Sequence, residues 1–330
     1  RMTAVASALR RPAHAIPADR LFLVTSRLAA LAILVIALSI LSPHFLTWSN
    51  GMNVLRQASV QFLMAAGLTL VVLTGGIDLS VGAVLGVAAC LGASFLNAGN
   101  IALGVVAALA AGLACGAVNG LVVSYIRVPP FIATYGMLWI AHGIGYIFMK
   151  GEVIYGFPPA FRAIGAGFTG AIPTTVIVAG AVLAGLHLTL HRTVLGRSLY
   201  AIGGNSNAAR LSGMPVQRRV FYAYALSGLL AGFAGLVVIA RTNAADAGLG
   251  EDLLLPAIAA VCLGGTSLLG GAGGIVGTAV GSLILALVVN GMNLLSVNTY
   301  WQAFVMGAII IVSVLADEWV ARRSAGRTGA

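Results

Sequence analysis

The chain has 330 residues, of which 60% are hydrophobic and 8% are charged, with 18 Lys and Arg against 8 Asp and Glu. This composition excludes a water-soluble domain and predicts an all-α, polytopic integral membrane protein. The formal net charge of +10 does not indicate nucleic-acid binding, because the excess is arginine between apolar stretches, where membrane topology and anionic lipid headgroups account for it.

Division of the chain at charges, prolines and polar clusters predicts about ten transmembrane helices. In chain order they are expected at 27–45, 54–73, 79–96, 101–124, 131–148, 173–190, 220–240, 253–269, 275–294 and 301–315. A single transmembrane domain, 27–317, then lies between an N-terminal tail, 1–26, and a C-terminal tail, 318–330. No small-residue cleavage site follows the first span, which is therefore interpreted as a retained helix and not as a signal peptide.

The basic residues predict how these spans are oriented. With the N-terminus inside, fourteen of the 18 Lys and Arg residues fall on the cytoplasmic side. The outer side then holds only Arg56, Lys150, Arg162 and Arg241. Because the number of spans is even, both tails are expected in the cytoplasm.

Small residues recur at intervals of four in three of the predicted spans. Such stripes let helix backbones approach closely in lipid, where no hydrophobic force drives helices together. They are Gly104, Ala108, Gly112, Gly116 and Gly120, then Gly228 and Gly232, and then Gly273, Gly277 and Gly281. The sequence therefore predicts compact, glycine-rich helix packing.

Two glycine-rich octets, 75–82 and 264–271, resemble each other, and each follows a span that runs from outside to inside. Helix breaks of this kind in transporters tend to lie near the transport path. The first octet contains Asp78, the only acid that the predicted spans leave next to membrane-depth sequence. Its carboxylate would bind a cation, a proton or a substrate hydroxyl, or it would cap the N-terminus of the third span. We favour the cap.

The segment 191–219 is basic, non-apolar and unlike the rest of the chain. Within it, Asn205 suits a helix N-cap, Gly213 suits a C-terminal cap, and Pro215 prevents the helix from continuing. The pattern predicts a helix of about two turns, which is too short to cross a bilayer. Its five arginines and lack of acids predict a cytoplasmic position, where a capped helix suggests a docking element.

The sequence contains no recognisable catalytic machinery. A phosphate-binding loop of the G-x-x-x-x-G-K-[ST] type needs a lysine, and the only lysine, Lys150, falls in a predicted outer loop. The H-E-x-x-H and CxxC spacings and a convincing Ser/His/Asp set are also lacking. Cys90, Cys115 and Cys262 lie in apolar stretches without metal-ligand spacing. We therefore expect no catalytic residue, no cofactor and no metal.

Nine short segments, in order along the chain, resemble the permease subunit of ABC-type sugar importers of the ribose, xylose and galactoside group. They are LTGGIDLSVG (73–82), NGLV (119–122), VPPFIAT (128–134), GRSLYAIGGN (196–205), AARLSG (208–213), AIAAV (257–261), LGGTS (263–267), NGMNL (290–294) and WQ (301–302). The resemblance runs from about residue 42 to residue 317.

The resemblance implies an all-helical permease, homodimeric or occasionally heterodimeric, in the bacterial inner membrane. A cytoplasmic ABC ATPase subunit would supply the energy, and a periplasmic or lipid-anchored solute-binding protein would deliver the solute. In such systems a short cytoplasmic helix of the permease docks into the ATPase. Here it maps onto Gly203, Gly204, Asn205, Ala208, Ala209, Arg210, Ser212 and Gly213.

Passage of a sugar calls for aromatic faces and for amide or hydroxyl hydrogen-bonding groups. The candidate pathway residues are Gln57, Gln61, Asp78, Asn119, Phe131, Tyr135, Trp139, Asn290 and Asn293. The outer loops 150–172 and 241–252 are the expected docking surface for the binding protein. Their acids are Glu152, Asp246, Glu251 and Asp252.

Several classes of solute are consistent with the sequence, because residues 253–256 read Leu-Leu-Leu-Pro where the family pattern has an aromatic residue and a glutamate. The alternative is an ABC permease for a nucleoside, a polyol, a sugar-like autoinducer or a branched-chain amino acid. More distant alternatives are an ion-coupled secondary transporter and a membrane scaffold that transports nothing.

Overall fold

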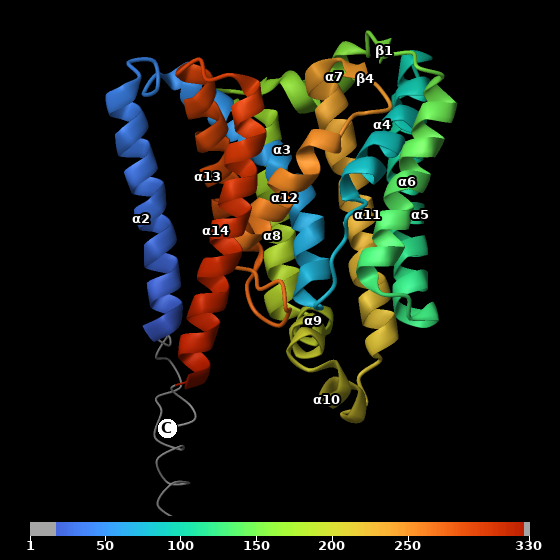
Figure 1. Ribbon diagram of the computed structural model, residues 1–330. Coiled ribbons are helices and arrows are strands. Elements are labelled where there is room, and N and C mark those ends of the chain that lie inside the picture. The colour runs from blue at the N-terminus through green and yellow to red at the C-terminus, as the bar shows by residue number, and fades with distance from the viewer. Residues whose placement is uncertain (1–17, 327–330) are drawn as a thin grey trace, which may run out of the picture.

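The computed structural model describes residues 18–326 of the chain, so the predicted tail residues 1–17 and 327–330 lie outside the described residues. Each predicted span falls on a helix (Figure 1). These helices are α2 (Ala18–Leu41), α3 (Trp48–Leu73), α4 (Val81–Asn97), α5 (Ile101–Leu121), α6 (Pro130–Met149), α8 (Thr174–Arg192), α11 (Val216–Thr242), α12 (Glu251–Leu263), α13 (Ile275–Leu294) and α14 (Thr299–Gly326). Since α2 begins at Ala18 and α14 runs to Gly326, parts of both predicted tails are helical.

Shorter elements connect these helices. They are the π-helix η1 (Val122–Ile126), the helices α7 (Pro159–Ala166), α9 (Val194–Gly204) and α10 (Ser206–Leu211), and the strands β1 (Ile154–Tyr155), β2 (Phe168–Thr169), β3 (Ile172–Pro173) and β4 (Ala244–Ala245). Strand β1 pairs with β4, and β2 pairs with β3, both antiparallel. The described chain is thus almost entirely helical, as predicted.

Six helices of the described range are long and apolar enough to cross a membrane, namely α3, α5 together with η1, α6, α8, α11 and α13. Shorter apolar helices are formed by Ala29–Leu41 of α2, by α4 and by Thr299–Ser313 of α14. The predicted span 253–269 is wrong in its extent, because α12 ends at Leu263. The chain turns there at Gly264 and Gly265, the latter at a φ of +70° that only glycine adopts readily.

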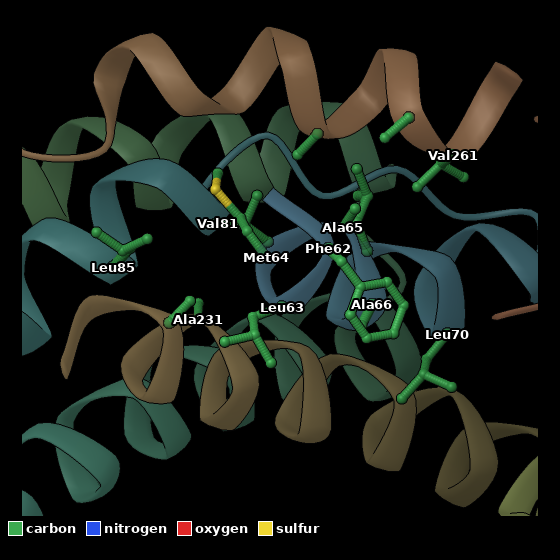
Figure 2. Packing of buried hydrophobic residues seen from close by; sticks show 14 of the residues in the cluster. Phe62, Leu63, Met64, Ala65, Ala66, Leu70, Val81, Leu85, Ala231 and Val261 are labelled. Carbon is green, nitrogen blue, oxygen red and sulfur yellow. The ribbon is translucent and has the colours of Figure 1, made fainter. Parts of the chain in front are cut away.

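The centre of the bundle is α3, whose residues from Ala58 to Leu73 are all buried. Helices α4, α11 and α12 supply most of the rest of this core, part of which Figure 2 shows around Phe62, Leu63 and Met64, and α6, α8, α9, α13 and α14 add one or two residues each. Helices α5, α6 and α8 instead leave most of their apolar residues at least partly exposed. A water-soluble protein would bury such residues. These faces therefore suit contact with lipid or with another membrane helix.

The closest helix pair confirms the prediction made from the small-residue stripes. A Cβ atom added to Gly112 of α5 would overlap the carbonyl oxygen of Gly228 on α11, and one added to Gly116 would overlap that of Tyr224. Gly281 of α13 meets Ala260 of α12 in the same way. Backbone contact therefore holds these helices together, and larger side chains would push them apart.

The two ends of the bundle differ. One end carries α7 and the strand pair β1–β4, and we call it the α7 face; the other carries α9 and α10, and we call it the α10 face (Figure 1). The first turn of α2 and the last turn of α14 both point toward the α10 face (Figure 1).

Candidate functional site

Helix α10 has the caps that the sequence predicts. The Asn205 side chain accepts a hydrogen bond from the backbone N–H of Ala208 (2.9 Å), and Gly213 has a φ of +79°. The coupling segment 203–213, mapped from the family resemblance, spans two helices, because Gly203 and Gly204 end the separate helix α9, which Thr193 caps through its hydroxyl.

Helix α10 projects from the bundle at the α10 face (Figure 1). Ala209 is buried and anchors it, whereas Leu211 is 89% exposed and the other residues of the helix are exposed too. An apolar side chain left in the open on a capped helix suits a docking element. Of the residues expected to couple to an ATPase, Asn205, Ala208, Arg210, Ser212 and Gly213 lie on this projecting part.

Gly203 ties α9 to both helix breaks. A Cβ atom on Gly203 would overlap the carbonyl oxygen of Leu73, at the end of α3, and the backbone nitrogen of Gly271. The same nitrogen donates a hydrogen bond to that carbonyl (3.0 Å). A Cβ on Gly270 would lie 2.6 Å from the nitrogen of Gly75. The two similar octets therefore meet at one point, the glycine junction, formed by Gly75, Gly203, Gly270 and Gly271.

Asp78 lies in the break between α3 and α4, is 1% exposed, and is surrounded by hydrogen-bond donors. Its Oδ1 accepts from the backbone N–H (3.0 Å) and the hydroxyl (2.6 Å) of Ser80, and its Oδ2 accepts from the hydroxyl of Ser227 on α11 (3.2 Å). The Asn119 amide on α5 donates to the Ser80 hydroxyl (2.8 Å). The favoured interpretation as a cap is wrong, because Ser80 holds the N-cap position of α4 and Asp78 closes a turn before it.

The predicted pathway residues do not gather in one place. Asn119 belongs to the Asp78 network, and Gln61 donates to the carbonyl oxygen of Pro256 on α12 (3.1 Å). Asn290 of α13 exchanges two hydrogen bonds with Asn50 of α3 (3.0 and 2.7 Å). The exposed Asn293 accepts from Gln302 of α14 (2.8 Å), and Gln57 is half-buried on α3. Most of these amides therefore join helices to one another.

The aromatic candidates form a row along the exposed side of α6. Phe131 stacks on Tyr135 at 6.0 Å between ring centroids, and Tyr135 meets Trp139 edge-on at 6.3 Å. The row continues through His142 to Tyr146. All three predicted aromatics are about half exposed or more, so this face is available to a solute or to another chain.

The segment 241–252 is not the surface loop that the sequence predicts. From the α7 face it runs along α4, where the Asp246 carbonyl accepts from the Cys90 thiol (3.2 Å) and Gly86 and Gly82 lie against the carbonyls of Leu249 and Gly250. Gly82 is in the first turn of α4, so the chain descends most of the length of that helix before α12 begins. Glu251, expected on a docking surface, therefore lies away from the α7 face, in a pocket beside α4 and α6.

The described residues line two pockets. One of about 530 Å³ is lined by residues of α4, α6 and α12, among them Trp139, His142, Tyr146 and Glu251. The other, of about 220 Å³, opens beside α10 and is lined by residues that include Thr74, Arg210 and Tyr224. The sequence places His142 and Tyr146 on one helical face with Trp139. The pairing with Glu251 was missed, since only the descent of 241–250 brings it there.

The fold and these sites define a class of protein, a multi-pass membrane protein in which a projecting helix, α10, is connected through α9 to two helix breaks. A family model described as "Branched-chain amino acid transport system / permease component" matches residues 50–314, and the chain belongs to this family. The resemblance inferred from the nine short segments is thereby confirmed. No solved structure matches the chain.

Three curated relatives illustrate the similarity. The ribose import permease protein of Escherichia coli (strain K12) is 44% identical over 295 residues, which are 88% of this chain and 92% of the relative. A probable ABC transporter permease protein of Sinorhizobium fredii is 36% identical, with 91% and 90% covered. A galactose/methyl galactoside import permease protein of Haemophilus influenzae is 35% identical, with 83% and 88% covered.

Proposed function

We propose that the chain is the permease subunit of an ATP-driven ABC importer that carries a sugar or sugar-like solute. The observation that carries the proposal is the continuous contact from the exposed helix α10, through α9 and the glycine junction, to both helix breaks. A transporter powered by a separate ATPase needs such an input. The similarity to ribose and galactose import permeases supports a sugar as the solute.

The proposed topology has ten transmembrane helices, with the α10 face in the cytoplasm of a bacterial cell and the bundle in the inner membrane. The distribution of basic residues supports it, because Arg192, Arg197, Arg210, Arg218 and Arg219 surround α9 and α10. Both described chain ends point the same way (Figure 1), which fits an even number of crossings and cytoplasmic tails.

In the proposed mechanism, two copies of the chain stand over two ATPase subunits, and closure of the ATPases moves α10. Because Gly203 has no side chain, its backbone is in direct contact with the backbones of Leu73 and Gly271. A displacement of α9 therefore moves both breaks. The breaks then shift α4 and α12 relative to α3 and exchange the outward and inward openings. A solute biases this equilibrium only by its different affinity for the two states.

A solute-binding protein would dock on the α7 face. Arginines on this face, and not the acids expected there, support this proposal. Arg56 stands 4.9 Å from the ring centroid of Phe168, and Arg56 and Arg241 are near enough for their charges to repel each other. Arg162 lies on α7 one turn before Gly165, and Gly165 packs against the backbone of Arg241. Among the described residues these arginines form no ion pair, so they are available to acids of a partner.

Reconstitution tests the function. The chain is placed in proteoliposomes with its ATPase and binding protein, and uptake of labelled D-ribose and D-galactose is measured with and without ATP. We expect uptake only with ATP and with all three components. Uptake that survives ATP depletion and instead stops when an ion gradient is dissipated would establish the ion-coupled alternative.

The family description favours a second candidate, a branched-chain amino acid as solute. The same proteoliposomes distinguish it, because labelled L-leucine would then be taken up with ATP, whereas labelled D-ribose and D-galactose would not. Uptake of a labelled sugar without uptake of labelled L-leucine supports the sugar.

A further inference from the structure

The pocket of about 530 Å³ between α4, α6 and α12 has a size typical of small-molecule sites and larger than a monosaccharide needs. Gly82 and Ala83 of α4 supply one wall, Leu138 to Tyr146 of α6 another, and Glu251 and Leu254 of α12 the third. Gly82 packs against the carbonyl of Gly250, so the floor of the pocket is the point where α4 and α12 begin. Any shift of either helix at its break therefore changes the pocket.

The pocket contains one polar pair. The Nε2 atom of His142 lies 3.6 Å from Oε1 of Glu251, too far for a hydrogen bond, and this buried nitrogen has no other hydrogen-bond partner among the described residues. Glu251 is 47% exposed along its side chain, against 13% for His142. A buried nitrogen without a partner is costly, and a solute hydroxyl that moves the Glu251 carboxylate aside would reach this nitrogen and bond to both side chains.

Aromatic rings form the adjoining wall. Trp139 is 60% exposed and Tyr146 is 51% exposed, and the rings of Trp139 and His142 meet nearly perpendicularly, with centroids 6.3 Å apart. A bare indole face beside a carboxylate suits a solute that has one apolar C–H face and hydroxyls at its edge.

The charges exclude anionic solutes. No lysine or arginine lines the pocket. The first turn of α12 carries both Glu251 and Asp252, which cancel the attraction that a helix N-terminus has for anions. The carboxylate of an amino acid or the phosphate of a sugar phosphate would find no partner here, whereas neutral hydroxyls donate readily to Glu251.

We propose that this pocket holds a neutral, polyhydroxylated solute during transport, with its ring on Trp139 and its hydroxyls between Glu251 and His142. This inference rests on the proposed function and narrows its solute to the sugar class. It gives Glu251 and His142 roles in solute binding instead of docking.

Tryptophan fluorescence tests the site directly in the permease. The chain has four tryptophans, and replacing Trp48, Trp301 and Trp319 by Phe leaves Trp139 as the sole reporter. The purified variant in lipid nanodiscs is titrated with D-ribose, D-galactose, ribose 5-phosphate and L-leucine. We expect a saturable change with at least one of the neutral sugars and none with the other two solutes.

Substitution of the polar pair then identifies the site. Glu251→Gln or His142→Ala in this background should weaken sugar binding about tenfold or more, whereas Glu152→Gln, at an exposed acid after α6, should leave it unchanged. The proposal is overturned if no sugar gives a saturable signal, if L-leucine binds as well as the sugars, or if Glu251→Gln and His142→Ala bind like the control. Sugar uptake that still requires ATP would then leave the proposed function standing.

Discussion

Asp78 shows how a buried acid can be satisfied without a cation. Three donors from Ser80 and Ser227 surround its carboxylate, and Asn119 extends the network to α5. In the described range the hydrogen-bond partners of its carboxylate are all neutral backbone and hydroxyl groups, as buried polar atoms require. We therefore expect Asp78 to fix the break between α3 and α4 against α11.

Replacing Asp78 tests this role. Asp78→Leu removes the acceptor for three buried donors, each of which then costs about 1–3 kcal/mol. We expect a lower thermal unfolding temperature in detergent, measured by fluorescence. Asp78→Asn retains one acceptor oxygen and should lower the unfolding temperature much less. Asp252→Asn, at an exposed acid, is the control and should match the parent. Equal unfolding temperatures for all three variants would show that the network does not hold the break.

At the scale of elements, much of the helix pattern follows from sequence because long apolar runs and local caps act within one segment. The Asn205 cap is of this kind. The stripes of small residues also indicate which helix faces pack closely, as those of Gly112 and Gly228 do. The path of 241–252 could not be predicted, since its three acids and two glycines resemble a surface loop. Its course depends on the space that Gly82 and Gly86 leave along α4, which is a property of another helix.

The adjacent glycines of α9 provide a matched test of the glycine junction. A Cβ atom on Gly203 would overlap backbone atoms of Leu73 and Gly271, whereas one on Gly204 would meet nothing within 4 Å. Both are helical glycines, so the change in helix propensity is similar in Gly203→Ala and Gly204→Ala.

In proteoliposomes with the ATPase and the binding protein, we expect Gly203→Ala to lower the ratio of solute transported to ATP hydrolysed about tenfold. Gly204→Ala should retain the parental ratio. Membrane insertion, measured by the amount of purified monodisperse protein, should be similar for the two. A parental ratio in well-folded Gly203→Ala would rule out transmission through this junction.

The whole molecule separates three tasks along its length. The α10 face presents a projecting helix with the glycine junction beside it, the pocket beside Trp139 lies further into the bundle, and the α7 face presents arginines without acidic partners among the described residues. The smaller pocket beside Arg210 and Thr74 lies on the other side of the α3–α4 break from the larger one. Residues on the two sides of that break line the two pockets, so in the proposed mechanism a shift at the break would change both.

The arginines of the α7 face make a prediction for the assembled importer. Because unlike charges speed and strengthen association, Arg241→Glu should weaken binding of the solute-binding protein about tenfold, which corresponds to about 1.4 kcal/mol. Arg197→Glu, an exposed arginine of α9, is the matched control and should leave this affinity unchanged. Raising the salt concentration should weaken the parent more than Arg241→Glu, since the parent has more charge to screen. Interferometry with the permease in nanodiscs measures both effects, and an affinity insensitive to charge reversal and salt would exclude docking through these arginines.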